Sequence, residues 1–187
     1  RAALITGMTP SMAQAPGLHD HIPEGVKTLP YFLGQQGYYT AAVGKWHMGP
    51  ASKVYFDEII DSIDDSGAAG WLDVLQQRPK DKPFFFWLAP HDGHLDYAGW
   101  HTPYLRFDNA GRELRPWVKK PWVDIWRYTI KLNNYFFEVR RIDRYIGQLF
   151  TALEREGILD NTLIVIISDN GPQQEAKGSL YDRALLT

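Results

Sequence analysis

The sequence predicts an α/β protein in which a mainly parallel sheet is flanked by helices. Two continuous apolar runs, at residues 84–89 and 162–168, are typical of parallel strands that are covered on both faces. A third, weaker strand is expected over residues 39–43. Helical segments alternate with these strands, and that order favours parallel pairing through helical crossovers.

Two helices are predicted from capping residues and apolar spacing. The first covers residues 29–33, where Thr28 can cap the helix and Pro30 lies in the first turn, at a place where its missing N–H costs little. The clearest helix covers residues 135–153, because its apolar residues recur at steps of four and three. Gly157 is expected to end it.

Residues 97–126 break this pattern. Tryptophans stand there among prolines and charged residues, and the apolar residues keep neither helical nor strand spacing. We therefore expect a long, ordered but irregular loop over the sheet edge. The tryptophans could stack on a sugar ring, although packing within the loop is their more usual role. They are Trp100, Trp117, Trp122 and Trp126.

Composition narrows the possible functions. The 187 residues are 44% hydrophobic and carry a formal net charge of -2 spread along the chain, which fits one globular domain without a basic surface for nucleic acid. The absence of cysteine excludes disulfides, thiolate metal sites and cysteine nucleophiles within these residues. No signal peptide or membrane span is apparent. We expect the chain to begin in mid-fold and the domain to be incomplete at both ends.

The strongest local motif is Gly44-Lys-Trp-His-Met-Gly49, directly after a short predicted strand. Ligand-binding groups gather at such positions in open α/β sheets. Lys45 and His47, framed by glycines, suit a tight turn that directs both side chains at one small anion. On spacing alone, a turn with an exposed lysine and a packed histidine is the more usual interpretation.

A second motif, Ser168-Asp-Asn-Gly171, ends the long apolar run. Asp169 and Asn170 could both offer oxygen ligands to a hard cation such as Ca²⁺ or Mg²⁺. Asn-Gly is also a common turn pair that needs no metal. The choice stays open from these residues alone.

A third motif, His91-Asp-Gly-His94, comes after residues 84–89. Its spacing permits a metal site, but two loop histidines more often form a hydrogen-bonded pair or a proton donor with a neighbour. Lys177, in a glycine-containing loop further along, would by itself be an ordinary solvated lysine.

Taken in order, these segments resemble the sulfatase family. Residues 1–7 are similar to the segment that begins at the arginine of the family's Cys-x-Pro-Ser-Arg signature, and residues 29–49 to its second signature. Residues 83–89 and 157–171 also match. The resemblance covers nearly the whole chain, is weakest over residues 97–126, and is nearest to the sulfamidases, or heparan N-sulfatases. It implies an alkaline-phosphatase-like α/β fold.

The resemblance also implies roles for single residues. Asp169 and Asn170 match the ligands of one Ca²⁺ ion. Arg1 matches an arginine that stabilises the nucleophile, and Lys45 and His47 match the pair beside it.

Two more residues match the substrate-binding side of the site. His94 corresponds to a sulfate-contacting histidine, and Lys177 to the basic residue of a later loop. With Lys45 they would bind the substrate's sulfate. The family usually has proline before that histidine, where Gly93 stands here, so His91 remains a lesser candidate.

The implied activity is hydrolysis of a sulfate ester or an N-sulfate on a small molecule or sugar. His94 or Lys177 would protonate the leaving group, and His47 would act as the base. The nucleophile would be a formylglycine, which would lie upstream of Arg1 because no residue here stands in its signature context. Family members are commonly exported or lysosomal, which implies an extracytoplasmic location.

Two alternatives remain open. A phosphatase, phosphonate hydrolase or phosphotransferase of the same superfamily would use a Ser or Thr nucleophile on a metal pair, and would need more acidic ligands or zinc-binding histidines. A non-catalytic sugar-binding relative could keep the fold and lack the nucleophile.

Overall fold

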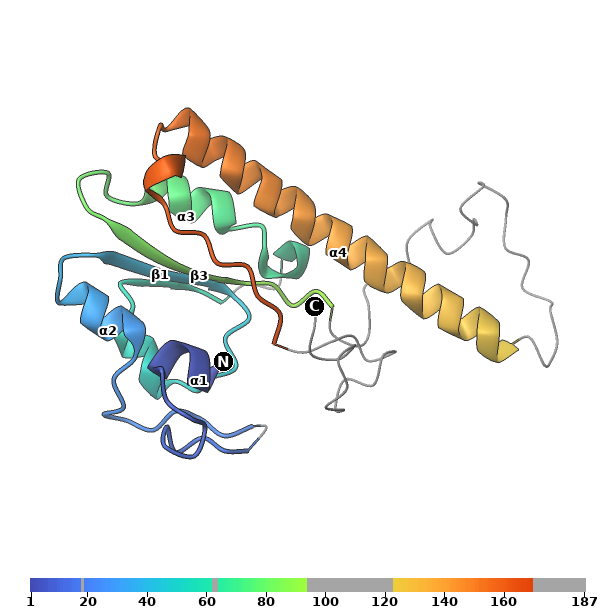
Figure 1. Cartoon of the computed structure of the whole chain (residues 1–187), viewed down its shortest axis with the longest axis horizontal. Coiled ribbons are helices and arrows are strands. Elements are labelled where there is room, and N and C mark those ends of the chain that lie inside the picture. The colour runs from blue at the N-terminus through green and yellow to red at the C-terminus, as the bar shows by residue number, and fades with distance from the viewer. Residues whose placement is uncertain (18, 62–63, 94–122, 170–187) are drawn as a thin grey trace. The chain divides into compact units, whose positions relative to one another are not determined.

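The computed structural model describes residues 1–17, 19–61, 64–93 and 123–169 (Figure 1). The chain divides into two compact units, Arg1–His91 and Asp92–Thr187. The first unit contains the sheet and the second contains the longest helix.

The sheet of the first unit is parallel, as predicted. Its strands are β1 (Tyr39–Gly44), β2 (Glu58–Ile60) and β3 (Phe84–Ala89), in the order β2-β1-β3. The central strand β1 is buried from Thr40 onward, whereas β3 is only half-buried except at Ala89. Two of the three predicted strands are therefore confirmed, and β2 is a strand that the sequence pattern did not predict.

Short helices cover both faces of this sheet. They are α1 (Ala2–Thr6), α2 (Leu29–Gly34) and α3 (Trp71–Gln77), together with 3₁₀ turns at Ala51–Tyr55 and Asp64–Gly67. Helices α1 and α2 lie on one side of the sheet and α3 lies on the other (Figure 1). The predicted helix at 29–33 is confirmed as α2, but the Thr28 side chain makes no capping hydrogen bond.

Neighbouring residues of β1 bury against opposite faces, because side chains alternate along a strand. Ala42 joins a buried cluster that draws on α1, β1 and the turn after β1. On the other face, a Cβ placed on Gly70, just before α3, would lie 3.2 Å from Val43 Cγ1. The cluster is Ile5, Ile22, Ala42, Trp46, Met48 and Phe56.

The second unit is built on one long helix, α4 (Val123–Arg155), followed by a 3₁₀ turn at Leu159–Asn161. Gly157 ends the helix in a left-handed conformation with φ 69°, as predicted, and its N–H bonds Glu154 O at 2.9 Å. The predicted irregular excursion was wrong at residues 123–126, which are helical, and its residues 97–122 lie outside the described ones. No helix in the described ranges combines the length and apolarity that a membrane span requires.

The predicted buried strand over residues 162–168 was wrong for the described structure. The segment has no strand pairing, and Leu163 is 90% exposed. A buried strand needs a partner for its backbone groups and a cover for its side chains. Among the described residues of the second unit there is only helix and turn, so that unit offers no strand to pair with.

Candidate functional site

The site begins where β1 and β3 end side by side. Gly44 and Ala89 are register partners at the carboxyl ends of the two strands, and Lys45 N–H donates to Ala89 O at 2.6 Å. Gly44 has φ 91°, and a Cβ there would lie 2.3 Å from Ala89 O. Only glycine fits, so the chain can turn at once and present Lys45 at the sheet edge, where the sequence predicted it.

Residues 45–48 alternate between the interior and the surface. Trp46 is 6% exposed and Met48 is 1% exposed, whereas Lys45 is half-buried and His47 is exposed. The two apolar side chains belong to the buried cluster of the first unit. Burying them anchors the turn, and the two basic residues between them are left at the surface.

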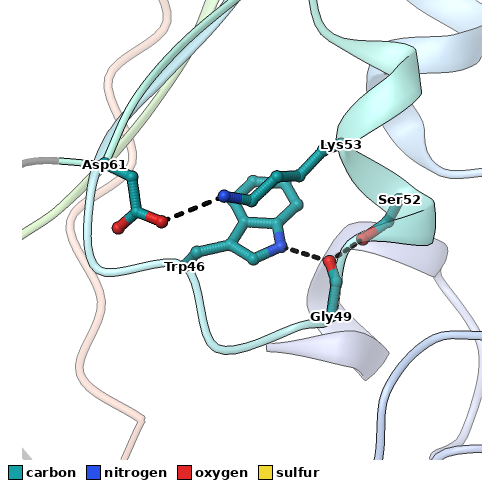
Figure 2. A network of polar contacts seen from close by, with 5 residues as sticks. All are labelled: Trp46, Gly49, Ser52, Lys53 and Asp61. Atoms are coloured by element: carbon teal, nitrogen blue, oxygen red, sulfur yellow. Dashed lines mark hydrogen bonds and ion pairs between the residues drawn. The ribbon is translucent and has the colours of Figure 1, made fainter.

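Polar contacts fix the same turn (Figure 2). Trp46 Nε1–H donates to Gly49 O at 2.6 Å, and Ser52 Oγ donates to the same oxygen at 3.4 Å. Lys53 Nζ lies 5.8 Å from the Trp46 ring centre and pairs with Asp61 at 2.9 Å. These contacts hold the indole at its N–H and over one face, and so anchor the turn.

His47 is held in an uncommon backbone conformation and contacts a second histidine. Its φ is 57°, in the left-handed region that non-glycine residues rarely adopt, and such strain is concentrated at functional sites. Its Nε2 lies 3.3 Å from His19 Nδ1. A hydrogen bond between imidazoles needs one N–H and one lone pair, so at least one ring is neutral while it is made.

His19 is the residue that the sequence analysis missed. It lies 28 positions before His47, and a contact between two loop histidines leaves no periodic or spacing signal in the sequence. A weak hint was that His19 belongs to a loop rich in histidine that precedes the Gly44 motif.

Arg1 stands at the start of helix α1, which packs in the same buried cluster as the turn after β1. It precedes α1, and its carbonyl accepts the Ile5 N–H at 3.0 Å. Ile5 packs in the same cluster as Trp46 and Met48. The first unit therefore contains Arg1, Lys45 and His47 on elements that pack together.

Of the other predicted site residues, the structure describes only Asp169 and His91. Asp169 is exposed and comes after the segment that forms no strand. His94, Asn170 and Lys177 lie outside the described residues, so the predicted gathering of all these groups around one anion stays a prediction. A metal site at His91 and His94 also stays a prediction.

The donor chemistry at Asp169 fits the predicted cation. Its carboxylate, followed in sequence by an amide, supplies the hard oxygen ligands that Ca²⁺ prefers. Within the described ranges no three His, Cys, Asp or Glu side chains come together as a metal site. A Ca²⁺ ion takes about six to eight oxygen ligands, so the Asp-Asn pair would need further ones.

Comparison with known proteins identifies the family. A family model described as Sulfatase matches residues 1–184. The chain is 27% identical to human N-sulphoglucosamine sulphohydrolase, over 97% of its own length and 42% of the relative's. It is 22% identical to human arylsulfatase A, over 92% of its length and 42% of the relative's. The chain thus spans less than half of each of these curated relatives.

Solved structures agree on the fold. BT4656, in complex with its substrate D-glucosamine-2-N,6-O-disulfate, superposes with a TM-score of 0.67 at 18% identity, covering 86% of this chain and 53% of that one. Ps i-CgsB, in complex with k-i-k-neocarrahexaose, superposes with a TM-score of 0.56 at 24% identity, covering 91% and 47%. With the family match over almost every residue, the chain belongs to the sulfatase family.

Proposed function

We propose that this chain is part of the catalytic domain of a sulfatase that hydrolyses a sulfate ester or N-sulfate on a sugar. The observation that carries the proposal is the turn at the end of β1, which buried neighbours anchor and which leaves Lys45 and His47 at the surface. Membership of the sulfatase family supports the same assignment.

The residues divide into three roles. Lys45, with His94 and Lys177, binds the sulfate oxygens and opposes the charge that grows on them in the transition state. His94 or Lys177 gives a proton to the leaving oxygen or nitrogen. His47 takes up a proton as the general base, and its contact with His19 orients the ring.

Arg1, Asp169 and Asn170 complete the proposed site. Asp169 and Asn170 would hold Ca²⁺, which supplies Lewis-acid polarisation of the sulfate when bound. Arg1 would stabilise the nucleophile, a formylglycine contributed by a residue outside these cysteine-free 187 positions. An extracytoplasmic location is part of the same proposal.

Glucosamine N-sulfate is the first substrate class to test. One relative, at 27% identity, is an N-sulphoglucosamine sulphohydrolase, and a superposable structure holds a 2-N,6-O-disulfated glucosamine. Three short segments that resemble the sulfamidases support the same choice: residues 17–20, residues 49–50 with 56–57, and residues 89–94.

The test uses the full-length protein that contains this chain and the variant Lys45→Ala. Removing a cation that acts on the transition state should lower kcat/KM by about 10²- to 10³-fold on N-sulfated glucosamine or an aryl sulfate. Thermal unfolding should change little, because a lysine that reaches solvent contributes little to stability.

The matched control is Lys27→Ala, an exposed lysine of the same unit that lies over the Tyr31 ring. Its kcat/KM should stay near wild type. A wild-type enzyme that hydrolyses phosphate esters but no sulfate would favour the phosphatase alternative, and an inactive one that still binds the sugar would favour the binding protein.

A further inference from the structure

A loop at residues 19–22 of the first unit lies against the turn after β1. The Ile22 N–H donates to Met48 O at 3.1 Å, and both side chains are only 1% exposed. A Cβ placed on Gly49 would lie 2.4 Å from His21 Cβ, so glycine at this position lets the two segments come close. These contacts set which residues of the loop meet which residues of the turn.

The same arrangement brings two imidazole rings together. His19 Nδ1 lies 3.3 Å from His47 Nε2, and the ring centres are 5.4 Å apart with their planes at 62°. Next to His19, the Asp20 N–H donates to Gly17 O at 3.2 Å, and Asp20 Oδ2 accepts the Gly17 N–H at 2.6 Å. Local hydrogen bonds in the loop and the anchored turn therefore support the pair from both sides.

A hydrogen bond between these two nitrogens has two possible directions, and only one leaves His47 able to accept a proton. If the His19 Nδ1–H donates, the His47 Nε2 lone pair is used and the hydrogen of neutral His47 is on Nδ1. Neither nitrogen of His47 can then take up a proton while the bond lasts. If the His47 Nε2–H donates to His19 Nδ1, the lone pair of His47 is at Nδ1. A general base needs this second direction.

We propose that His19 is a positioning residue that holds His47 in the tautomer with hydrogen on Nε2, so that Nδ1 takes up the proton. The inference rests on the proposed function, which makes His47 the general base. Once Nδ1 has accepted the proton, His47 is a cation whose Nε2–H still donates to neutral His19. A hydrogen bond from a charged donor is stronger than a neutral one. His19 thus stabilises the protonated base more than the neutral base, and this difference accelerates the proton transfer.

The direct test is NMR of the full-length protein labelled with ¹⁵N in its histidine rings. The chemical shifts of the two ring nitrogens distinguish the one that carries hydrogen, and the signals that a His47→Gln variant lacks belong to His47. At about pH 8.5, where an ordinary imidazole is neutral, His47 should carry its hydrogen on Nε2. In His19→Ala this preference should be lost. Hydrogen on Nδ1 of His47 in the wild type overturns the inference.

Steady-state kinetics test the same assignment through activity. His19→Ala removes the acceptor and should lower kcat on the sulfated substrate by about 10- to 100-fold. KM should stay within about threefold of wild type, because His19 acts on the base and not on the sulfate. His19→Asn places an amide oxygen close to the position of Nδ1 and should recover most of kcat. Thermal unfolding of both variants should stay near wild type, since His19 is exposed.

The matched control is His21→Ala, since His21 is an exposed histidine of the same loop. The alanine keeps the Cβ that Gly49 accommodates and removes only the ring, so kcat should match wild type. The inference is overturned if folded His19→Ala keeps kcat within about threefold of this control. It is also overturned if His19→Asn loses as much activity as His19→Ala.

The NMR result separates this inference from the proposed function. A wild-type protein with hydrogen on His47 Nε2 but no activity on any sulfated substrate contradicts the sulfatase assignment and supports the tautomer that His19 holds. An active wild-type protein with hydrogen on His47 Nδ1 removes the role of His19 and leaves the sulfatase assignment intact.

Discussion

Gly44 connects the central strand to the turn that bears Lys45 and His47, and its position leaves no room for a side chain. We expect Gly44→Ala to destabilise the protein by more than about 3 kcal/mol, because a left-handed alanine is strained and its Cβ would meet the backbone oxygen of Ala89. Chemical denaturation of the two proteins measures the difference.

The control for this substitution is Gly34→Ala. Gly34 is the last residue of α2, has no atom within 4 Å of a built Cβ, and does not have a positive φ. The change should be neutral or stabilise by up to about 1 kcal/mol, because alanine loses less backbone entropy on folding. Equal losses for the two variants would contradict the assigned cause.

For single residues, the sequence predicted candidate site residues better than it predicted which side chains touch. Lys45 and His47 could be predicted because both lie in one short motif framed by glycines. The contact between His19 and His47 could not, since it joins side chains 28 positions apart. Such pairings depend on the packing of whole elements, which residue types and spacing do not encode locally.

Two buried threonines test how the short elements of the first unit are stabilised. Thr28 precedes α2 with 0% exposure, and its hydroxyl has no hydrogen-bond partner among the described residues. Thr40 in β1 is 1% exposed, but its hydroxyl bonds Asp57 Oδ2 at 3.0 Å and the Asp57 N–H at 3.1 Å.

Substitution by valine should therefore have opposite effects at the two positions. Thr28→Val removes a buried, unsatisfied hydroxyl without changing shape, so stability should be unchanged or rise by up to about 1 kcal/mol. Thr40→Val removes both hydroxyl hydrogen bonds to Asp57, although the backbone bonds between the two residues remain, and should cost about 1–3 kcal/mol. Denaturation midpoints would measure both, and a loss at Thr28 comparable to that at Thr40 would refute the comparison.

Element lengths explain which helices and strands of the two units could be predicted. Strand β3 and helix α4 have long apolar or periodic patterns, and both were found from sequence. Strand β2 has three residues, including Glu58, and α3 has seven and starts after Gly70 without a capping side chain. Such short elements are stabilised by their neighbours, and local propensity leaves little signal.

For the whole molecule, we expect the isolated 187-residue chain to have no sulfatase activity. It contains no cysteine, and none of its serines stands in the family's signature context, so it has no source of formylglycine. Its cations could stabilise charge on a sulfate, but without a nucleophile there is no bond-forming step for them to accelerate.

The assay uses an aryl sulfate and N-sulfated glucosamine, with the full-length protein as positive control. Measurable turnover by the isolated chain would overturn the proposed mechanism. Activity only in the longer protein would agree with a nucleophile supplied from outside these residues.

Residues 162–168 form an exposed apolar segment without strand pairing, and this has a consequence for handling the isolated chain. Leu163, Val165, Ile166 and Ile167 are each more than half exposed, in a run without charge or proline. Short, uncharged segments rich in β-branched residues readily stack with copies of themselves. In a concentrated solution, copies of this segment would pair through their backbones, and the isolated chain would tend to form cross-β aggregates.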